Sequence, residues 1–308
     1  MSWNPTDLPG QHGRTFAVTG STAGIGYFAA EQLATTGARV VLASRSPGRL
    51  ERAAASIRRE VPGADVTTVV LDLASLASVR RAAAELLALD RLDGILLNGG
   101  SMSTRRHATT QDGFSELLGT HVVANVALTT ALLPALGGPA PRVVHTTTGF
   151  VGRWKARVED VTTPQRGFLR SYTWAKTVTE LYAYELHRRL RAAGHPVQSV
   201  LTFPGVGVDA RTPARDGVFD PRTQTRRNPF SPWAQGKDAA AWAGVRGLLD
   251  PALGGGELLG PADGRRGLPE VAGPRPHTAH PDPALLARVW EQLHELSGTP
   301  APGFDRAA

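Results

Sequence analysis

The amino-acid sequence predicts an α/β fold in which helices cover both faces of a doubly wound parallel sheet of about seven strands. Two observations predict it. Short apolar segments alternate with longer segments of helical periodicity along most of the chain, as in repeated strand–helix units. The apolar segments are also nearly continuous, which is typical of strands buried on both faces. The 308 residues suffice for one large domain with a full core.

The first unit begins with an apolar run at residues 14–19. The glycine-rich stretch GSTAGIG follows, and the next stretch, YFAAEQLATTG, places Phe28 and Leu33 at helical spacing. We therefore predict a strand, a glycine turn and a helix. The alternation continues through six further strands, at 38–44, 66–73, 94–100, 141–148, 196–203 and 255–261, and five further helices, at 47–61, 74–89, 111–136, 171–193 and 237–250.

The composition changes after the last of these strands. Residues 262–283 are rich in Pro and Gly and are expected to be irregular, and ALLARVWEQL predicts a terminal helix after them. We therefore divide the chain into a folded domain at 1–261 and a tail at 262–308 whose terminal helix packs on that domain.

Composition also narrows the classes of function. The absence of cysteine excludes disulfides, thiolate metal sites and cysteine nucleophiles and suits a reducing compartment, so we expect a cytoplasmic protein without a metal. Neither a signal-peptide pattern nor a run of about 18 apolar residues occurs, so we expect no membrane span. The formal charge of +7 comes from scattered arginines, which argues against nucleic acid and favours anionic small ligands. Only three basic residues are lysines, Lys155, Lys176 and Lys237.

Three glycines mark the first strand-to-helix turn, at Gly20, Gly24 and Gly26. Glycine permits a tight turn there and lets backbone N–H groups approach a pyrophosphate. The turn therefore predicts a Rossmann-type dinucleotide site, and an ordinary glycine-rich turn is the alternative. The residues expected to bind the cofactor here are Thr19, Gly20, Ser21, Gly24, Ile25 and Gly26.

The ends of the next strands predict which cofactor binds. The second strand ends at Ser44 and Arg45, where an enzyme that holds the ribose diol of NAD carries an acid. An arginine can instead hold a 2′-phosphate, so NADP is expected rather than NAD, with a surface arginine as the alternative. Further contacts to the cofactor are expected from Asp72 and Leu73 after the third strand and from Asn98, Gly99 and Gly100 after the fourth.

A candidate proton-transfer pair lies in the stretch SYTWAKTVTE. Tyr172 and Lys176 are four residues apart on a predicted helix, so their polar ends can share one site. A nearby cation can shift the pKa of a phenol toward neutrality, and a chance spacing is the alternative. Thr148, at the end of the strand 141–148, is the best-placed hydroxyl to hold a substrate carbonyl.

Together these motifs have the order and spacing of the short-chain dehydrogenase/reductase family, which the chain resembles from about residue 14 to 261. The gap between Thr148 and Tyr172, the stretch LASR and the ending ALLARVWEQL resemble its retinol dehydrogenase and protochlorophyllide reductase-like branch. The resemblance implies that Tyr172 is the general acid/base and that Lys176 binds the nicotinamide ribose and lowers the tyrosine pKa. It also implies that Pro204, Gly205 and Val206 contact the cofactor.

The chain departs from the family pattern at several positions. Thr148 stands where most members have serine, His121 where they have a catalytic asparagine, and Asp209 where they have a threonine near the carboxamide. The resemblance further implies a substrate lid at about 207–237, with a plain surface insertion as the alternative. It also implies a homodimer through the helices 111–136 and 171–193.

The expected function is an NADP-preferring oxidoreductase that interconverts a small-molecule carbonyl and an alcohol, with Tyr172, Lys176, Thr148 and His121 as catalytic residues. Because His121 and Asp209 depart from the pattern, the alternative is a protein that binds NAD(P) and has lost or altered catalysis. Nucleic-acid binding, which the basic charge alone would suggest, lacks a recognition motif.

Overall fold

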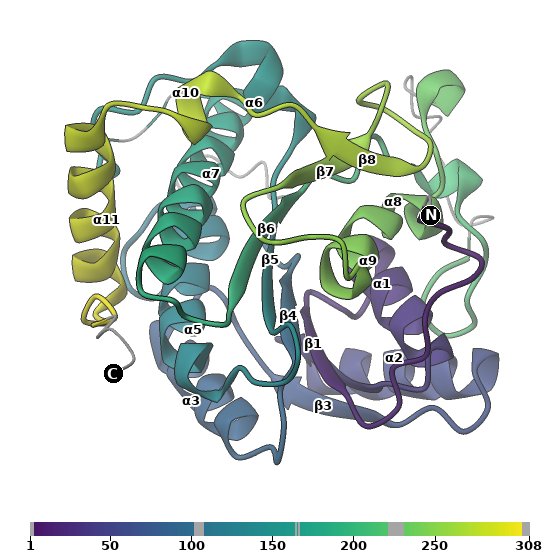
Figure 1. The fold of residues 1–308 in the computed structure, drawn as a ribbon. Coiled ribbons are helices and arrows are strands. Elements are labelled where there is room, and N and C mark those ends of the chain that lie inside the picture. The colour runs from purple at the N-terminus through teal and green to yellow at the C-terminus, as the bar shows by residue number, and fades with distance from the viewer. Residues whose placement is uncertain (1–2, 102–107, 164, 166, 221–230, 304–308) are drawn as a thin grey trace.

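The structure is a computed structural model that describes residues 3–101, 108–163, 165, 167–220 and 231–303. One eight-stranded sheet runs through its centre, with helices on both faces (Figure 1). The strand order is β3-β2-β1-β4-β5-β6-β7-β8, and the reversal between β1 and β4 is the switch point at which such sheets bind ligands. The strands are β1 (Thr15–Thr19), β2 (Arg39–Ser44), β3 (Val66–Val70), β4 (Gly94–Leu97), β5 (Arg142–Thr146), β6 (Gln198–Thr202), β7 (Leu258–Pro261) and β8 (Pro269–Ala272).

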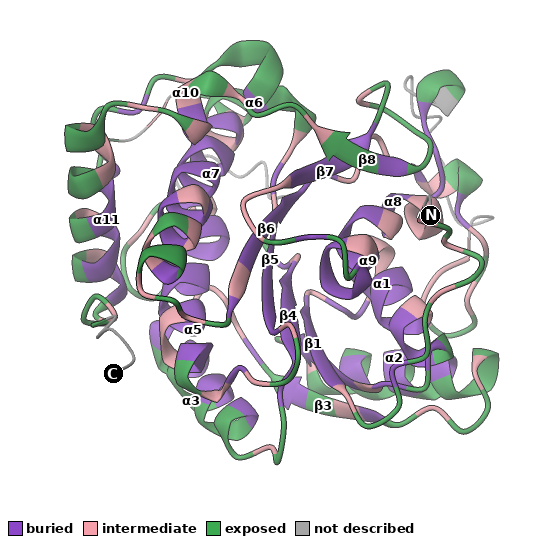
Figure 2. Ribbon diagram, in the orientation of Figure 1, coloured by how far each residue is buried: buried purple, intermediate pink, exposed green. Residues whose placement is uncertain are grey.

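Two hydrophobic cores lie on opposite faces of this sheet, because side chains alternate along each strand. In β1, Ala17 belongs to the core beneath α3, α5 and α7, whereas Phe16 and Val18 belong to the core beneath α1, α2 and α9. Figure 2 shows the buried strands between helices whose outer sides are exposed. The helices are α1 (Gly24–Thr35), α2 (Pro47–Glu60), α3 (Leu76–Leu87), α4 (Glu116–Leu118), α5 (Ala124–Leu132), α6 (Gly149–Trp154), α7 (Phe168–Ala192), α8 (Lys237–Ala240), α9 (Trp242–Leu249), α10 (Pro276–Ala279) and α11 (Pro283–Ser297).

The predicted α/β sheet with parallel strands is confirmed, with one strand more than expected. β1 to β7 pair in parallel, whereas β8 pairs antiparallel with β7 in the segment that was expected to be irregular. β8 has only four residues, begins with proline and lies at the sheet edge, so its sequence carries little strand signal. Of the predicted lid and tail, residues 221–230 and 304–308 lie outside the described residues.

The single helix predicted at 111–136 is wrong in detail. Helical structure begins at Glu116, and a π-helical turn, Gly119–Val123, precedes α5. A π-helical turn contains one residue more than an α-helical turn and shifts the polar face of a helix. Here every residue from Leu118 to Thr129 is buried, so there is no polar face whose shift could be detected in the sequence. By length and composition Glu116–Ala135 would also suffice to cross a membrane, but its most apolar window is 78% buried inside the fold, as in a core helix.

The terminal helix α11 covers the outer side of α5 and α7 (Figure 1). Its anchor is Trp290, which is buried and stacks on Tyr182 of α7 with ring centroids 5.4 Å apart. The guanidinium of Arg189 lies 4.5 Å from the centroid of the same indole. A homodimer through α5 and α7 would therefore require α11 to leave this face.

Candidate active site

A cavity of about 490 Å³ opens at the carboxyl ends of the first four strands. It lies beside the switch point, because β1 and β4 are neighbours in the sheet. β3 and β4 end earlier than predicted, at Val70 and Leu97, and residues that follow them turn into the cavity wall. The lining residues are Gly20, Ala43, Ser44, Arg45, Leu71, Asp72, Leu73, Ala74, Gly99, Gly100, Ser101, Glu116 and Thr120.

The glycine turn is packed so tightly against β4 that side chains are excluded. Gly20 has a φ of +67°, and a Cβ atom there would lie 2.8 Å from the Gly99 Cα atom. A Cβ atom on Gly26 would lie 2.4 Å from the Gly20 carbonyl oxygen. Asn98 ties the two strands together, since its side-chain amide donates to the Thr19 carbonyl at 3.3 Å. The backbone is therefore the surface that a ligand meets here.

Other predicted cofactor residues surround this turn. Ser44 lies 3.3 Å from the Thr22 hydroxyl, Arg45 is exposed, and one carboxylate oxygen of Asp72 accepts from the Ala74 N–H. Ile25 packs at the margin of the core, and the buried Ser21 hydroxyl has no hydrogen-bond partner among the described residues. A glycine cradle, an exposed arginine beside it and a cavity at the switch point fit a nicotinamide dinucleotide.

Tyr172 lies near the start of α7, and its ring is held from two sides. It lies edge-on to His121, with ring centroids 5.5 Å apart, and stacks on Phe168 at 6.1 Å. Burial raises the pKa of Tyr172 to about 12, and a hydrogen bond with the Thr148 side chain opposes this rise. The tyrosine and the threonine that sequence reasoning singled out therefore do meet, and the phenol carries its proton at neutral pH.

Lys176 lies one turn further along α7 and is buried. Its ammonium donates to the Thr146 carbonyl at 2.6 Å, at the end of β5. Burial lowers the pKa of Lys176 to about 7, against the attraction of Glu180. The expectation that Lys176 lowers the pKa of Tyr172 is not met here, because the effect of burial on the phenol dominates.

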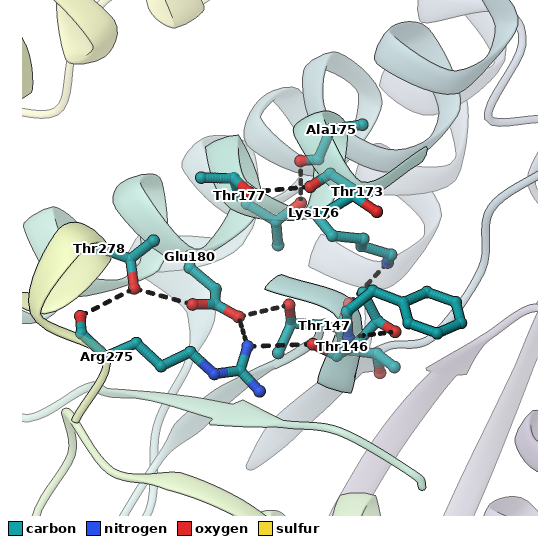
Figure 3. Close-up of polar contacts among 12 residues, drawn as sticks. Thr146, Thr147, Thr173, Ala175, Lys176, Thr177, Glu180, Arg275 and Thr278 are labelled. Atoms are coloured by element: carbon teal, nitrogen blue, oxygen red, sulfur yellow. Dashed lines mark hydrogen bonds and ion pairs between the residues drawn. The ribbon is translucent and has the colours of Figure 1, made fainter. Parts of the chain in front are cut away.

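Glu180 organises a polar network that sequence reasoning missed. Its buried carboxylate accepts from the hydroxyls of Thr147 at 2.7 Å and Thr278 at 2.8 Å and pairs with Arg275 (Figure 3). Arg275 also donates to the Thr148 carbonyl at 3.0 Å. The tail thus supports Thr148, which is not the end of a strand as predicted: β5 ends at Thr146, and Thr148 is the N-cap of α6. Only the four-residue spacing between Lys176 and Glu180 signals this network in the sequence.

His121 lies in the π-helical turn, against the end of β4. A Cβ atom on Gly100 would lie 2.1 Å from the imidazole Cε1 atom, so glycine is required for this contact. The ring Nε2 atom is 2.8 Å from the Ser101 carbonyl, and Nδ1 is buried without a hydrogen-bond partner among the described residues. The backbone carbonyl of His121 accepts from the Asn125 amide at 2.9 Å. Burial, followed by repulsion from Lys176, lowers the pKa of His121 to about 3.

The pKa of His121 predicts a loss of stability in acid. Below about pH 6.5 His121 is protonated in the unfolded chain but stays neutral in the folded chain. This difference lowers the free energy of unfolding by about 1.4 kcal/mol for each pH unit. His121→Asn should therefore reduce the slope of stability against pH between pH 6 and pH 4 by about that amount. Urea unfolding at a series of pH values measures it. An unchanged slope would show that His121 is protonated in the folded protein.

The segment after β6 is held against residues that follow β7. Gly205 has a φ of +68°, and a Cβ atom there would lie 2.3 Å from the Arg265 carbonyl oxygen. The Val206 N–H donates to that same carbonyl at 2.7 Å, and the Gln235 amide donates to the Pro204 carbonyl at 2.9 Å. Beyond it, Asp209 forms an ion pair with Lys237.

Comparisons with known proteins agree with this architecture. Residues 14–153 match the family model described as short chain dehydrogenase. The chain is 34% identical to polyprenol dehydrogenase of Mus musculus over 99% of its own length and 90% of that protein. It is 33% identical to human retinol dehydrogenase 13 over 63% of its own length and 59% of that protein.

Solved structures give the same result. An uncharacterised protein from Mycobacterium paratuberculosis is 28% identical with a TM-score of 0.78, over 98% of this chain and 100% of that one. A short chain dehydrogenase from Salmonella enterica serovar Typhi is 25% identical with a TM-score of 0.61, over 81% and 96%.

A nicotinamide-dependent oxidoreductase is the class of protein that this sheet and this site define. The relatives place the chain within that class: it belongs to the short-chain dehydrogenase/reductase family, as the sequence motifs indicated. The retinol dehydrogenases among its relatives agree with the predicted branch.

Proposed function

We propose that the protein is an NADP-preferring oxidoreductase that interconverts the alcohol and carbonyl forms of an apolar substrate, with Tyr172 as general acid/base. The observation that carries the proposal is the contact between the Tyr172 and Thr148 side chains, one helical turn from the buried ammonium of Lys176. A donor and a second hydroxyl at one point can hold and protonate a single substrate oxygen.

In this mechanism each side chain has one task. Bound NADP supplies or accepts the hydride. The Thr148 hydroxyl positions the substrate oxygen, and Tyr172, protonated at neutral pH, donates its proton to that oxygen in the reductive direction. Lys176, which is held one helical turn away by its hydrogen bond to the Thr146 carbonyl, would bind the nicotinamide ribose. His121 supports the ring of Tyr172 from the side.

Arg45 supports the preference for NADP. Its side chain is exposed at the end of β2 and lines the cavity, so it is free to bind a 2′-phosphate with two charge-assisted hydrogen bonds. The ribose hydroxyls of NAD would find a cation there instead of a carboxylate acceptor.

An apolar substrate is supported by the side chains around Tyr172. Phe150 and Trp154 of α6 stack at 4.6 Å and are 38% and 44% exposed, and Leu169 at the start of α7 is 42% exposed. Phe150 and Trp154 follow Thr148 along the chain and Leu169 precedes Tyr172, and the exposed aromatic pair offers an apolar surface to a ligand. The names of the relatives, polyprenol and retinol dehydrogenase, point to the same kind of alcohol.

The second candidate is a protein that binds NADP without turnover. It is favoured by His121, whose low pKa leaves it neutral and without a charge to share in a proton relay. Asp209 adds a carboxylate where a donor is expected.

A substrate panel separates the two candidates. NADPH binding and oxidation would be measured with a series of straight-chain aldehydes and with a sugar of similar size as control. Each methylene that is buried adds about 0.8 kcal/mol, so kcat/KM should rise by up to about fourfold per methylene. NADPH binding without oxidation by any aldehyde would favour the second candidate.

A further inference from the structure

Lys237 is one of the three lysines of the chain, and no step above uses it. It is the first residue of α8, yet its side chain lies over the glycine turn at the start of α1. A Cβ atom on Gly24 would lie 3.4 Å from Lys237 Cδ and 3.9 Å from its Nζ atom. On the other side, a Cβ atom on Gly207 would lie 3.4 Å from Lys237 Cγ. The lysine therefore bridges the glycine turn and the segment after β6.

The backbone beneath Lys237 is held firmly. Its N–H donates to the Thr212 hydroxyl at 2.9 Å, and the Gln32 amide of α1 donates to the Asp238 carbonyl at 2.8 Å. These bonds fix the base of the side chain relative to α1. A cation held on a fixed base loses little conformational entropy when it binds a ligand.

The ammonium is paired with Asp209 through the buried Oδ1 atom of that residue, although both side chains are partly exposed. The side chains of Lys237 and Asp209 are 28% and 30% exposed. The helix beside them lacks a cap, because Ala23 offers no side-chain acceptor and the first turn of α1 has no acid. The buried hydroxyl of Ser21, in the same turn, is also without a hydrogen-bond partner among the described residues. Lys237 and the uncapped start of α1 thus lie side by side, and the carboxylate that pairs with the lysine among the described residues is Asp209.

We propose that Lys237 is a ligand of the cofactor pyrophosphate and that Asp209 is the counter-ion that the pyrophosphate displaces. The inference rests on the proposed function, since it assigns residues to the same cofactor. A pyrophosphate carries more negative charge than one carboxylate and also accepts from the N–H groups of the turn, so it takes Lys237 from Asp209. The released Asp209 carboxylate then opposes binding by repulsion.

The two partners should therefore have opposite effects on affinity. Lys237→Gln removes a charge-assisted contact and should weaken NADPH binding by about tenfold to a hundredfold. Asp209→Asn removes the competing and repelling carboxylate and should tighten binding by about threefold to tenfold. A merely structural ion pair predicts a loss of affinity in both variants, because each breaks the same contact.

The test is a fluorescence titration of the full chain with NADPH, with ADP and adenosine as competitors. Lys237→Gln should weaken the binding of ADP and leave the binding of adenosine unchanged, since only ADP carries a diphosphate. Arg39→Gln is the matched control, because Arg39 and Asp65 form an exposed ion pair near the start of β2, away from the turn. Thermal unfolding of each variant checks that it is folded.

If the wild type binds and oxidises NADPH, an unchanged affinity of Lys237→Gln for NADPH, or a weakened affinity of Asp209→Asn, would overturn this inference. The proposed function would then still stand. A wild type that binds no NADPH would overturn the inference together with the proposed function.

Discussion

Tyr172→Phe should lower kcat by about two to four orders of magnitude, the usual contribution of a positioned general acid. The phenylalanine ring keeps the contacts to Phe168 and His121, so the fold and the affinity for NADPH should change little. Stopped-flow oxidation of NADPH with a saturating aldehyde measures the chemical step directly.

The matched control for this variant is Tyr184→Phe. Tyr184 lies on the same helix, its pKa is likewise raised to about 12 by burial, and its hydroxyl has no hydrogen-bond partner among the described residues. The control should retain full activity. Activity of Tyr172→Phe close to that of the wild type would remove Tyr172 from the mechanism.

Arg45→Asp should exchange the preference between the two cofactors. Loss of a charge-assisted pair and the new repulsion between carboxylate and 2′-phosphate together cost about 3 kcal/mol, so NADPH should bind about a hundredfold more weakly. NADH, whose ribose hydroxyls can donate to the new carboxylate, should bind as well as before or better. The affinities follow from titrations with both cofactors.

Because Arg45 is exposed, its replacement should leave the stability of the protein nearly unchanged. Arg52→Asp, at an exposed position further along α2, has the same change of charge and should affect both cofactors equally and slightly. Equal losses for NADPH and NADH in Arg45→Asp would mean that Arg45 acts only through its general charge.

The sheet could be predicted because each of its first six strands is an apolar run followed by a segment with helical periodicity. Such patterns indicate which residues are buried, but they do not indicate the details of the backbone. The π-helical turn at His121 escapes them because the helix is buried all round, and β8 escapes them because an edge strand of four residues has too few buried positions. The early ends of β3 and β4 depend on backbone turns into the cavity, which apolar residues such as Leu71 do not reveal.

In the candidate site, too, some residues could be predicted from the sequence and others could not. Tyr172 and Lys176 were found because their spacing on one helix is local. Glu180, Arg275 and Thr278 were not, since their network joins α7 to a tail about a hundred residues away in sequence, and no local pattern encodes that contact. Lys237 was noticed only because lysine is rare in this chain, and its place over Gly24 required the structure.

The position of Arg275 has a consequence for how the protein matures. The residues expected to carry the chemistry are all translated before residue 180, but the arginine that donates to the Thr148 carbonyl and pairs with Glu180 is translated 95 residues after Glu180. A growing polypeptide can therefore assemble the nucleotide-binding half first, and the segment after β5 gains its support only when Arg275 has been made. Stable folding therefore depends on the tail, because a chain cut short before Arg275 would leave the buried carboxylate of Glu180 without its ion-pair partner.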